Sequence, residues 1–162
     1  MSGHRTLAFG LALATLLLNF AIAHVLASVK GPLILIPGLL DFIQTWNRGV
    51  SFSLFWQDGD KGRYVLIAVL AAVVLFVAIL AWRSANLFQA TGYGLVVGGA
   101  LGNLADRSLN GAVFDYLFLH LGPAPLFVFN FPDVAITLGV LLLLADTLRA
   151  EKAQSRIVDS GM

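Results

Sequence analysis

Two aspartates, Asp115 and Asp133, have the type and placement that hydrolysis of an amide bond would use. Asp115 follows the turn-prone pair Asn110-Gly111, and Asp133 precedes a long apolar run. If the two carboxyl groups meet in space, they can share one proton. The ionised group then takes a proton from an attacking water, and the protonated group stabilises the developing oxyanion. Aspartate before an apolar run is also a common N-cap. Helix capping therefore stays open as the alternative for one or both residues.

Other polar side chains surround these aspartates in the sequence. Asp106 and Arg107 lie three and four residues after Asn103, so the three share a face on a continuing helix. The neighbours Asp106 and Arg107 favour a structural or positioning ion pair. Asn47 and Asn130 can donate side-chain hydrogen bonds to a substrate backbone, although turn-forming asparagine is the alternative.

Other catalytic groups show no matching pattern. The chain has no cysteine, which excludes disulfides, thiolate metal sites and a cysteine nucleophile. Its three histidines lack the HExxH spacing of zinc proteases. No G-x-S-x-G elbow is present, and neither Lys30 nor Lys61 places an obvious base beside Ser51 or Ser53. A zinc hydrolase and a serine–lysine hydrolase are therefore disfavoured.

The composition places these residues in a membrane protein. Hydrophobic residues make up 59% of the 162 positions and charged residues only 12%, with a mean hydropathy of +0.87. A net charge of +1, without basic runs among aromatics, gives no reason to expect nucleic acid as a partner. A bilayer core about 30 Å thick needs roughly 20 apolar helical residues. Four segments fit that length, which predicts one membrane domain over residues 1–162 with spans at about 6–27, 64–82, 87–107 and 131–148.

The first span also has features of a cleavable secretory signal, because a basic start and an apolar run lead to Ala21-Ile22-Ala23. The apolar run continues through Ala27, which favours a retained helix. With four spans, the termini share one side of the membrane and the loops at about 28–60 and 108–130 share the other. Basic residues are balanced between the sides. They favour cytoplasmic termini only if Arg48 and Arg107 are held by site partners.

Two further patterns concern architecture. The first loop is rich in aromatic and β-branched residues broken by Gly and Pro, which predicts short strands and an interfacial element. Its aromatic residues suit either the water–lipid boundary or substrate contact: Trp46, Phe52, Phe55 and Trp56. In the third span, Gly94, Gly98 and Gly102 recur every four residues, which predicts close packing against another helix.

With these residues in place, the chain resembles the signal peptidase II family, the intramembrane aspartyl proteases that mature bacterial lipoproteins. The resemblance covers about residues 46–139 in three ordered motifs: NRGVSF, GGALGNLADR running on to GAVFDY, and FNFPD. It implies that Asp115 and Asp133 form the catalytic dyad. It also implies a surrounding substrate-binding and supporting site of Asn47, Gly49, Asn103, Asp106, Arg107 and Asn130.

The resemblance further implies an all-α membrane fold of four transmembrane helices with a small extracytoplasmic β-cradle. Termini would be cytoplasmic, and the active site would lie near the outer surface of the bacterial inner membrane. The substrate would be a diacylglyceryl-modified prolipoprotein, cut N-terminal to its lipidated cysteine without metal or cofactor, by an enzyme we expect to be a monomer in contact with membrane lipid.

The chain differs from the family pattern at Asn19 and Ala23, where Asp and Lys are common, and at Pro132, where a small residue is usual. The competing hypothesis is a non-catalytic polytopic membrane protein that binds a lipoprotein precursor or another ligand.

Overall fold

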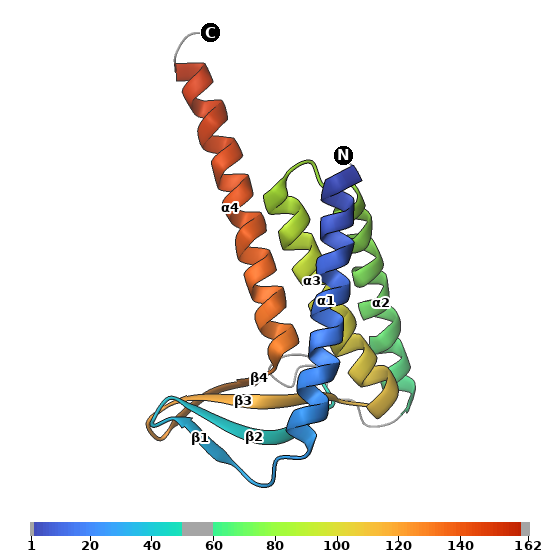
Figure 1. The fold of residues 1–162 in the computed structure, drawn as a ribbon, viewed down its shortest axis with the longest axis vertical. Coiled ribbons are helices and arrows are strands. Elements are labelled where there is room, and N and C mark those ends of the chain that lie inside the picture. Colours follow the sequence, from blue (N-terminus) through green and yellow to red (C-terminus); the bar gives the residue numbers. More distant parts are fainter. Residues whose placement is uncertain (1, 50–59, 160–162) are drawn as a thin grey trace.

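A computed structural model describes residues 2–49 and 60–159, and within them four long helices meet a four-stranded sheet (Figure 1). In chain order the elements are α1 (Ser2–Ala27), β1 (Leu33–Ile36), β2 (Leu40–Asn47), α2 (Asp60–Trp82), α3 (Leu87–Asn110), β3 (Val113–Leu121), β4 (Ala124–Phe129) and α4 (Phe131–Asp159). The sheet crosses one end of the helices and extends sideways from them, and both termini lie at the opposite end (Figure 1).

Helix α3 packs against each of the other three helices. A Cβ atom added at Gly94 or Gly98 would lie 2.6 Å from the backbone oxygen of Ala8 or Ala12 of α1, so α1 approaches closely only because these positions are glycine. The predicted glycine ridge is therefore confirmed. A second face, which the sequence pattern did not reveal, serves α4: a Cβ at Gly99 would lie 2.5 Å from an α4 backbone oxygen.

Three helical segments among the described residues are long and apolar enough to cross a membrane: Gly3–Ala27, Gly62–Trp82 and Phe131–Arg156. The expected span at 87–107 does form helix α3, but α3 is not one of these three segments. Its glycines and the polar Gln89 and Asn103 lower its mean hydropathy. Such residues are tolerated there because much of the surface of α3 faces other helices and not lipid. The observed fold is thus a mainly helical membrane protein with three candidate spans and a small antiparallel sheet.

The sheet has the order β1-β2-β3-β4, with every neighbouring pair antiparallel. The loop predicted at 28–60 supplies β1 and β2, and the loop at 108–130 supplies β3 and β4. In the central pair, Thr45 faces Asp115 and Asn47 faces Val113. This pairing carries Asn47 to the strand that holds Asp115. The predicted interfacial residues Phe52, Phe55 and Trp56 lie outside the described residues.

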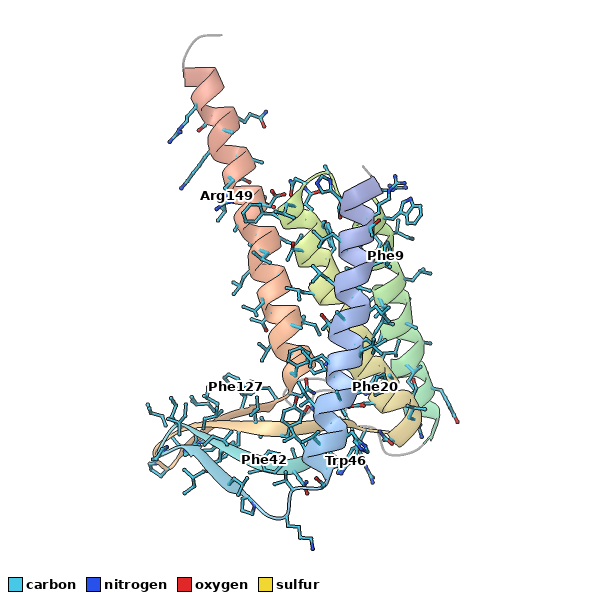
Figure 2. The ribbon with its side chains drawn as sticks, viewed as in Figure 1. Phe9, Phe20, Phe42, Trp46, Phe127 and Arg149 are labelled. Carbon is cyan, nitrogen blue, oxygen red and sulfur yellow. The ribbon has the colours of Figure 1, made fainter. Side chains whose placement is uncertain are left out.

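The sheet is fixed to α1 by an apolar cluster and by a cap. Phe42, Phe114 and Tyr116 are buried together, and residues of α1 pack against them. Figure 2 shows Phe42 and Trp46 where α1 meets the sheet. Gln44 of β2 donates through Nε2 to Leu26 O in the last turn of α1 at 3.0 Å, and to Val29 O just after the helix at 3.1 Å. These contacts satisfy carbonyls at the helix end and hold β2 in place.

Candidate active site

Asn130 connects the two aspartates, which lie on different elements. Its Nδ2 donates to Asp115 Oδ1 of β3 at 2.6 Å. Its backbone N–H donates to Asp133 Oδ2 in the first turn of α4 at 3.3 Å, and its Oδ1 accepts from the Asp133 N–H at 2.9 Å. Asn130 is only 1% exposed. The structure therefore brings Asp115, which is buried, and Asp133, which is partly buried, into one site.

The start of α4 explains how Asp133 is held. The reciprocal bonds between Asn130 and Asp133 form a capping box, in which Asn130 is the N-cap and Asp133 is the third helical residue. The N-cap alternative for Asp133 is therefore wrong in detail, because Asn130 occupies that position. The Phe131 N–H donates to Tyr116 Oη at 2.9 Å. With these first-turn donors satisfied, the orientation of Asp133 is set by the helix start.

Each aspartate also accepts a hydrogen bond from a further side-chain amide. Asn47 Nδ2 donates to Asp115 Oδ2 at 3.1 Å, and Asn103 Nδ2 donates to Asp133 Oδ1 at 2.8 Å. The Asn103 Oδ1 atom lies 3.2 Å from Asn130 Nδ2, which closes the network. All four carboxylate oxygens thus accept from N–H groups, so both carboxyl groups have defined positions.

Asp115 has the environment of a group that can hold a proton near neutral pH. It is 4% exposed, and this burial raises its pKa to about 6, with a further increase from the charge of Asp133. Hydrogen bonds from Asn47 and Asn130 and the charge of Arg107 act in the opposite direction. The balance makes a pair with one shared proton accessible at physiological pH.

Arg107, Asp106 and Gly49 hold the backbone around the site. Arg107 is 4% exposed and donates through Nη2 to Gly49 O at 2.6 Å. The Gly49 N–H in turn donates to Asn47 Oδ1 at 3.0 Å, which directs the Asn47 amide toward β3. Asp106 Oδ2 accepts from the Phe114 N–H at 3.4 Å, at the start of β3. Arg107 and Asp106 thus have separate partners where the sequence suggested that they pair with each other.

Tyr116 is a site residue that sequence reasoning missed. It is 3% exposed, and burial raises its pKa to about 12, so the phenol stays protonated. Its hydroxyl joins β3, which carries Asp115, to the first residue of α4, which carries Asp133. A tyrosine after an aspartate forms no distinctive sequence pattern. Its role appears only in the structure, where Tyr116 of β3 contacts the start of α4.

The departures from the family pattern gather behind the site. Asn19 of α1 is 2% exposed, and a Cβ at Gly102 would lie 3.1 Å from both Asn19 Nδ2 and Pro132 Cγ. Ala23 packs against the Phe42 cluster. Asn19 and Pro132 therefore meet at Gly102, between the helix turns that carry Asn103 and Asp133. Among residues 2–49 and 60–159, no group of three or more His, Asp or Glu has an arrangement that could hold a metal ion.

Residues 7–149 match the family described as signal peptidase (SPase) II. A lipoprotein signal peptidase of Methylorubrum extorquens is 49% identical over 109 residues, which cover 67% of this chain but only 64% of that relative. One from Rhizorhabdus wittichii is 38% identical over 164 residues, covering 97% of this chain and 95% of the relative.

The fold is also that of solved structures. A bacterial membrane enzyme superimposes with a TM-score of 0.75 and 21% identity, over 88% of this chain and 87% of the other. A second bacterial membrane enzyme structure has a TM-score of 0.69 and 22% identity, over 91% of this chain and 94% of the other. At these identities the structures support the fold, and the sequence matches establish the family. This chain belongs to the signal peptidase II family.

Proposed function

We propose that this chain removes signal peptides from lipoprotein precursors in a bacterial inner membrane as an aspartic peptidase, with Asp115 and Asp133 as its catalytic pair. The family match and the relatives named lipoprotein signal peptidase support the activity. The observation that carries the residue assignment is the single buried Asn130 that hydrogen-bonds to both aspartates. The family match does not favour a non-catalytic binding protein.

The geometry suits general acid–base hydrolysis of an amide. The ionised member of the pair takes a proton from water as the water oxygen bonds to the carbonyl carbon, and the protonated member donates to the developing oxyanion. When the C–N bond breaks, a proton passes to the leaving amine. Because the pair titrates as a unit, neither aspartate has a fixed role as base at rest. Amide donors hold the carboxylates before substrate binds, which lowers the entropic cost of aligning them.

The substrate in this proposal is a diacylglyceryl-modified prolipoprotein, cut N-terminal to its lipidated cysteine by a monomer. Its lipid anchor and signal helix are both soluble in the bilayer, so binding energy from parts that do not react can hold the amide near the pair. Asn47, Gly49, Asn103, Asp106, Arg107 and Asn130 support the site.

The membrane arrangement in this proposal has four spans in one domain, with α3 as the fourth. Helix α3 packs against all three candidate spans, which supports its placement at the same depth. Both termini lie at the end opposite the sheet (Figure 1), which supports termini and site on opposite sides of the membrane. With cytoplasmic termini, as the family resemblance implies, the site lies near the outer surface.

Cleavage of a synthetic diacylglyceryl-prolipoprotein by purified protein tests the proposal. We expect either Asp115→Asn or Asp133→Asn to lower kcat by about 10²- to 10⁴-fold, because each substitution removes a group that transfers a proton. Asp146→Asn, at the opposite end of the bundle, is the matched control and should keep its activity. Full activity in either site variant would overturn the residue assignment, and no cleavage by the unmutated protein would overturn the activity.

A further inference from the structure

An apolar groove runs between α1 and α2, with α3 as its floor, and has a volume of about 460 Å³. Small side chains on the facing helices leave this space open. Among the residues that line it are Ala12 and Leu16 of α1, Ala71 and Ala78 of α2, and Val97 and Leu101 of α3. Both α1 and α2 are candidate membrane spans. Because the hydrocarbon core contains no water, a lipid chain is the occupant available to an apolar groove at this depth.

A fixed cation lies at the end of this groove that is remote from the sheet. Phe9 lines the groove, and its ring centroid is 6.1 Å from that of Trp82. The guanidinium carbon of Arg5 lies 4.7 Å from the Trp82 ring centroid, and Arg5 Nε donates to Trp82 O at 2.9 Å. Arg83 follows Trp82 and is exposed. Arginine and tryptophan together are typical of the headgroup level of a membrane.

The distance from the cation to Leu16, the last residue of α1 that lines the groove, matches one acyl chain. Arg5 and Leu16 lie on the same helix, and at about 1.5 Å per residue the 11-residue step spans roughly 16 Å. Half of a hydrocarbon core about 30 Å thick is roughly 15 Å. A lipid with its phosphate at Arg5 would therefore extend one acyl chain along the part of the groove that α1 lines, from Phe9 to Leu16.

The charges at this end of the bundle are compatible with an anion. Asp146 is the carboxylate of the adjoining α3–α4 contact, and it accepts from Asn86 Nδ2 at 2.9 Å and from Gln89 Nε2 at 2.8 Å. Arg5 is held by a helix-end carbonyl and an aromatic ring, and neither contact neutralises its charge. A planar guanidinium held in this way suits a phosphate oxygen pair.

We propose that this groove binds one acyl chain of an anionic phospholipid, whose phosphate pairs with Arg5. The site lies at the opposite end of the bundle from Asp115 and Asp133 and takes no part in the proposed cleavage. It would hold the closely spaced starts of α1 and α3 against the end of α2, and it would give the protein a preference among the lipids around it.

Quenching of tryptophan fluorescence by brominated lipid tests the proposal. The chain has three tryptophans, so the double variant Trp46→Phe, Trp56→Phe leaves Trp82 as the sole reporter. This variant would be reconstituted in phosphatidylcholine vesicles that contain a brominated lipid, either phosphatidylglycerol or phosphatidylcholine. We expect brominated phosphatidylglycerol to quench Trp82 at a several-fold lower mole fraction. Equal quenching by the two lipids would overturn the proposal.

Matched variants test separately the groove that binds the acyl chain and the arginine that binds the phosphate. Ala78→Phe fills the groove and should abolish the preference for phosphatidylglycerol, whereas Val73→Phe, on an exposed part of the same helix, should leave it unchanged. Arg5→Gln should remove the preference and Arg5→Lys should retain it. Cleavage activity reports that each variant is folded. Loss of quenching on addition of soluble glycerol phosphate would indicate a site for free phosphate and would also overturn the lipid assignment.

Discussion

The two ends of the helix bundle each hold an aspartate between two side-chain amides, but the surroundings of these aspartates differ. At the end with the termini, Asp146 of α4 accepts from Asn86 and Gln89 at 2.9 and 2.8 Å. Both donors belong to the start of α3, where the Asn86 side chain also accepts from the Gln89 N–H as the N-cap. This cluster joins two helices, and among residues 2–49 and 60–159 its hydrogen bonds reach no second carboxylate.

At the sheet end, the donors to Asp115 come from different parts of the chain. Asn47 belongs to β2, and Asn130 belongs to the junction of β4 and α4, where it also bonds to Asp133. A carboxylate between two amides is thus a helix contact at one end and half of a coupled pair at the other. The difference is the second carboxylate, and Asn130 is the residue that creates the coupling.

Among changes to the side-chain amides that contact the aspartates, the largest effect is expected from Asn130→Asp. Aspartate is also a good N-cap, so the start of α4 keeps an acceptor for the Asp133 N–H. The donor to Asp115 is replaced by a carboxylate oxygen, and removal of a preorganised donor from an active site typically costs about 10²- to 10³-fold in kcat. Cleavage kinetics and the thermal unfolding midpoint in detergent would be measured together.

Asn130→Ser serves as the control for this change, because serine also caps a helix but adds no charge. It should unfold at a temperature close to that of the unmutated protein while kcat still falls, by less than in Asn130→Asp. If Asn130→Asp kept full activity, the coupling of Asp115 to Asp133 through Asn130 would not matter for catalysis. The functional difference from the Asp146 cluster would then disappear.

A smaller effect, on pH dependence, is expected from Asn47→Ala. The Asn47 amide stabilises the ionised form of Asp115 and so lowers its pKa. Without this bond the pKa of Asp115 should rise above about 6, by about one pH unit for a lost hydrogen bond to a charged group. The singly protonated pair then persists to higher pH, so the alkaline limb of the profile of kcat against pH should move to higher pH. Asn86→Ala, at the other end, should leave the profile in place, and a shift toward lower pH in Asn47→Ala would contradict the role given to Asn47.

The smallest effect on catalysis is expected from Asp146→Asn. This change weakens the contact between α3 and α4 and should lower the free energy of unfolding by about 1 kcal/mol, while kcat and its pH profile stay unchanged. Thermal unfolding and cleavage assays check the two parts. A loss of kcat as large as that of Asn130→Asp would mean that the two aspartate clusters are not functionally distinct.

The sequence pattern predicted the helices and one helix contact, because these depend on apolar length and on residue spacing within one segment. Apolar length gave all four helices, although α4 continues to Asp159, well beyond the apolar segment. The spacing of Gly94 and Gly98 predicted close packing against another helix correctly, and the structure identifies that helix as α1. Helix α3 forms as expected but is not among the three candidate spans, and a helix surrounded by other helices needs fewer apolar residues than one that faces lipid.

The arrangement of the site depended on contacts that local sequence does not encode. Asn47 reaches Asp115 only because β2 pairs with β3, and α2 and α3 separate these strands in the chain. Asn130 has the same sequence context whether it merely turns the chain or connects two carboxylates. Proximity in sequence also did not reveal that Asp106 and Arg107, which interact through their charges, hydrogen-bond to different backbone segments.

The most direct test of a shared proton is the kcat of the double variant Asp115→Asn, Asp133→Asn beside the two single variants, all with the diacylglyceryl-prolipoprotein substrate. Residues that act as one unit show strongly non-additive losses. If Asp115 and Asp133 form such a unit, each single variant and the double variant should have the same residual rate. Losses that multiply in the double variant, or a single variant that retains the full rate, would contradict it.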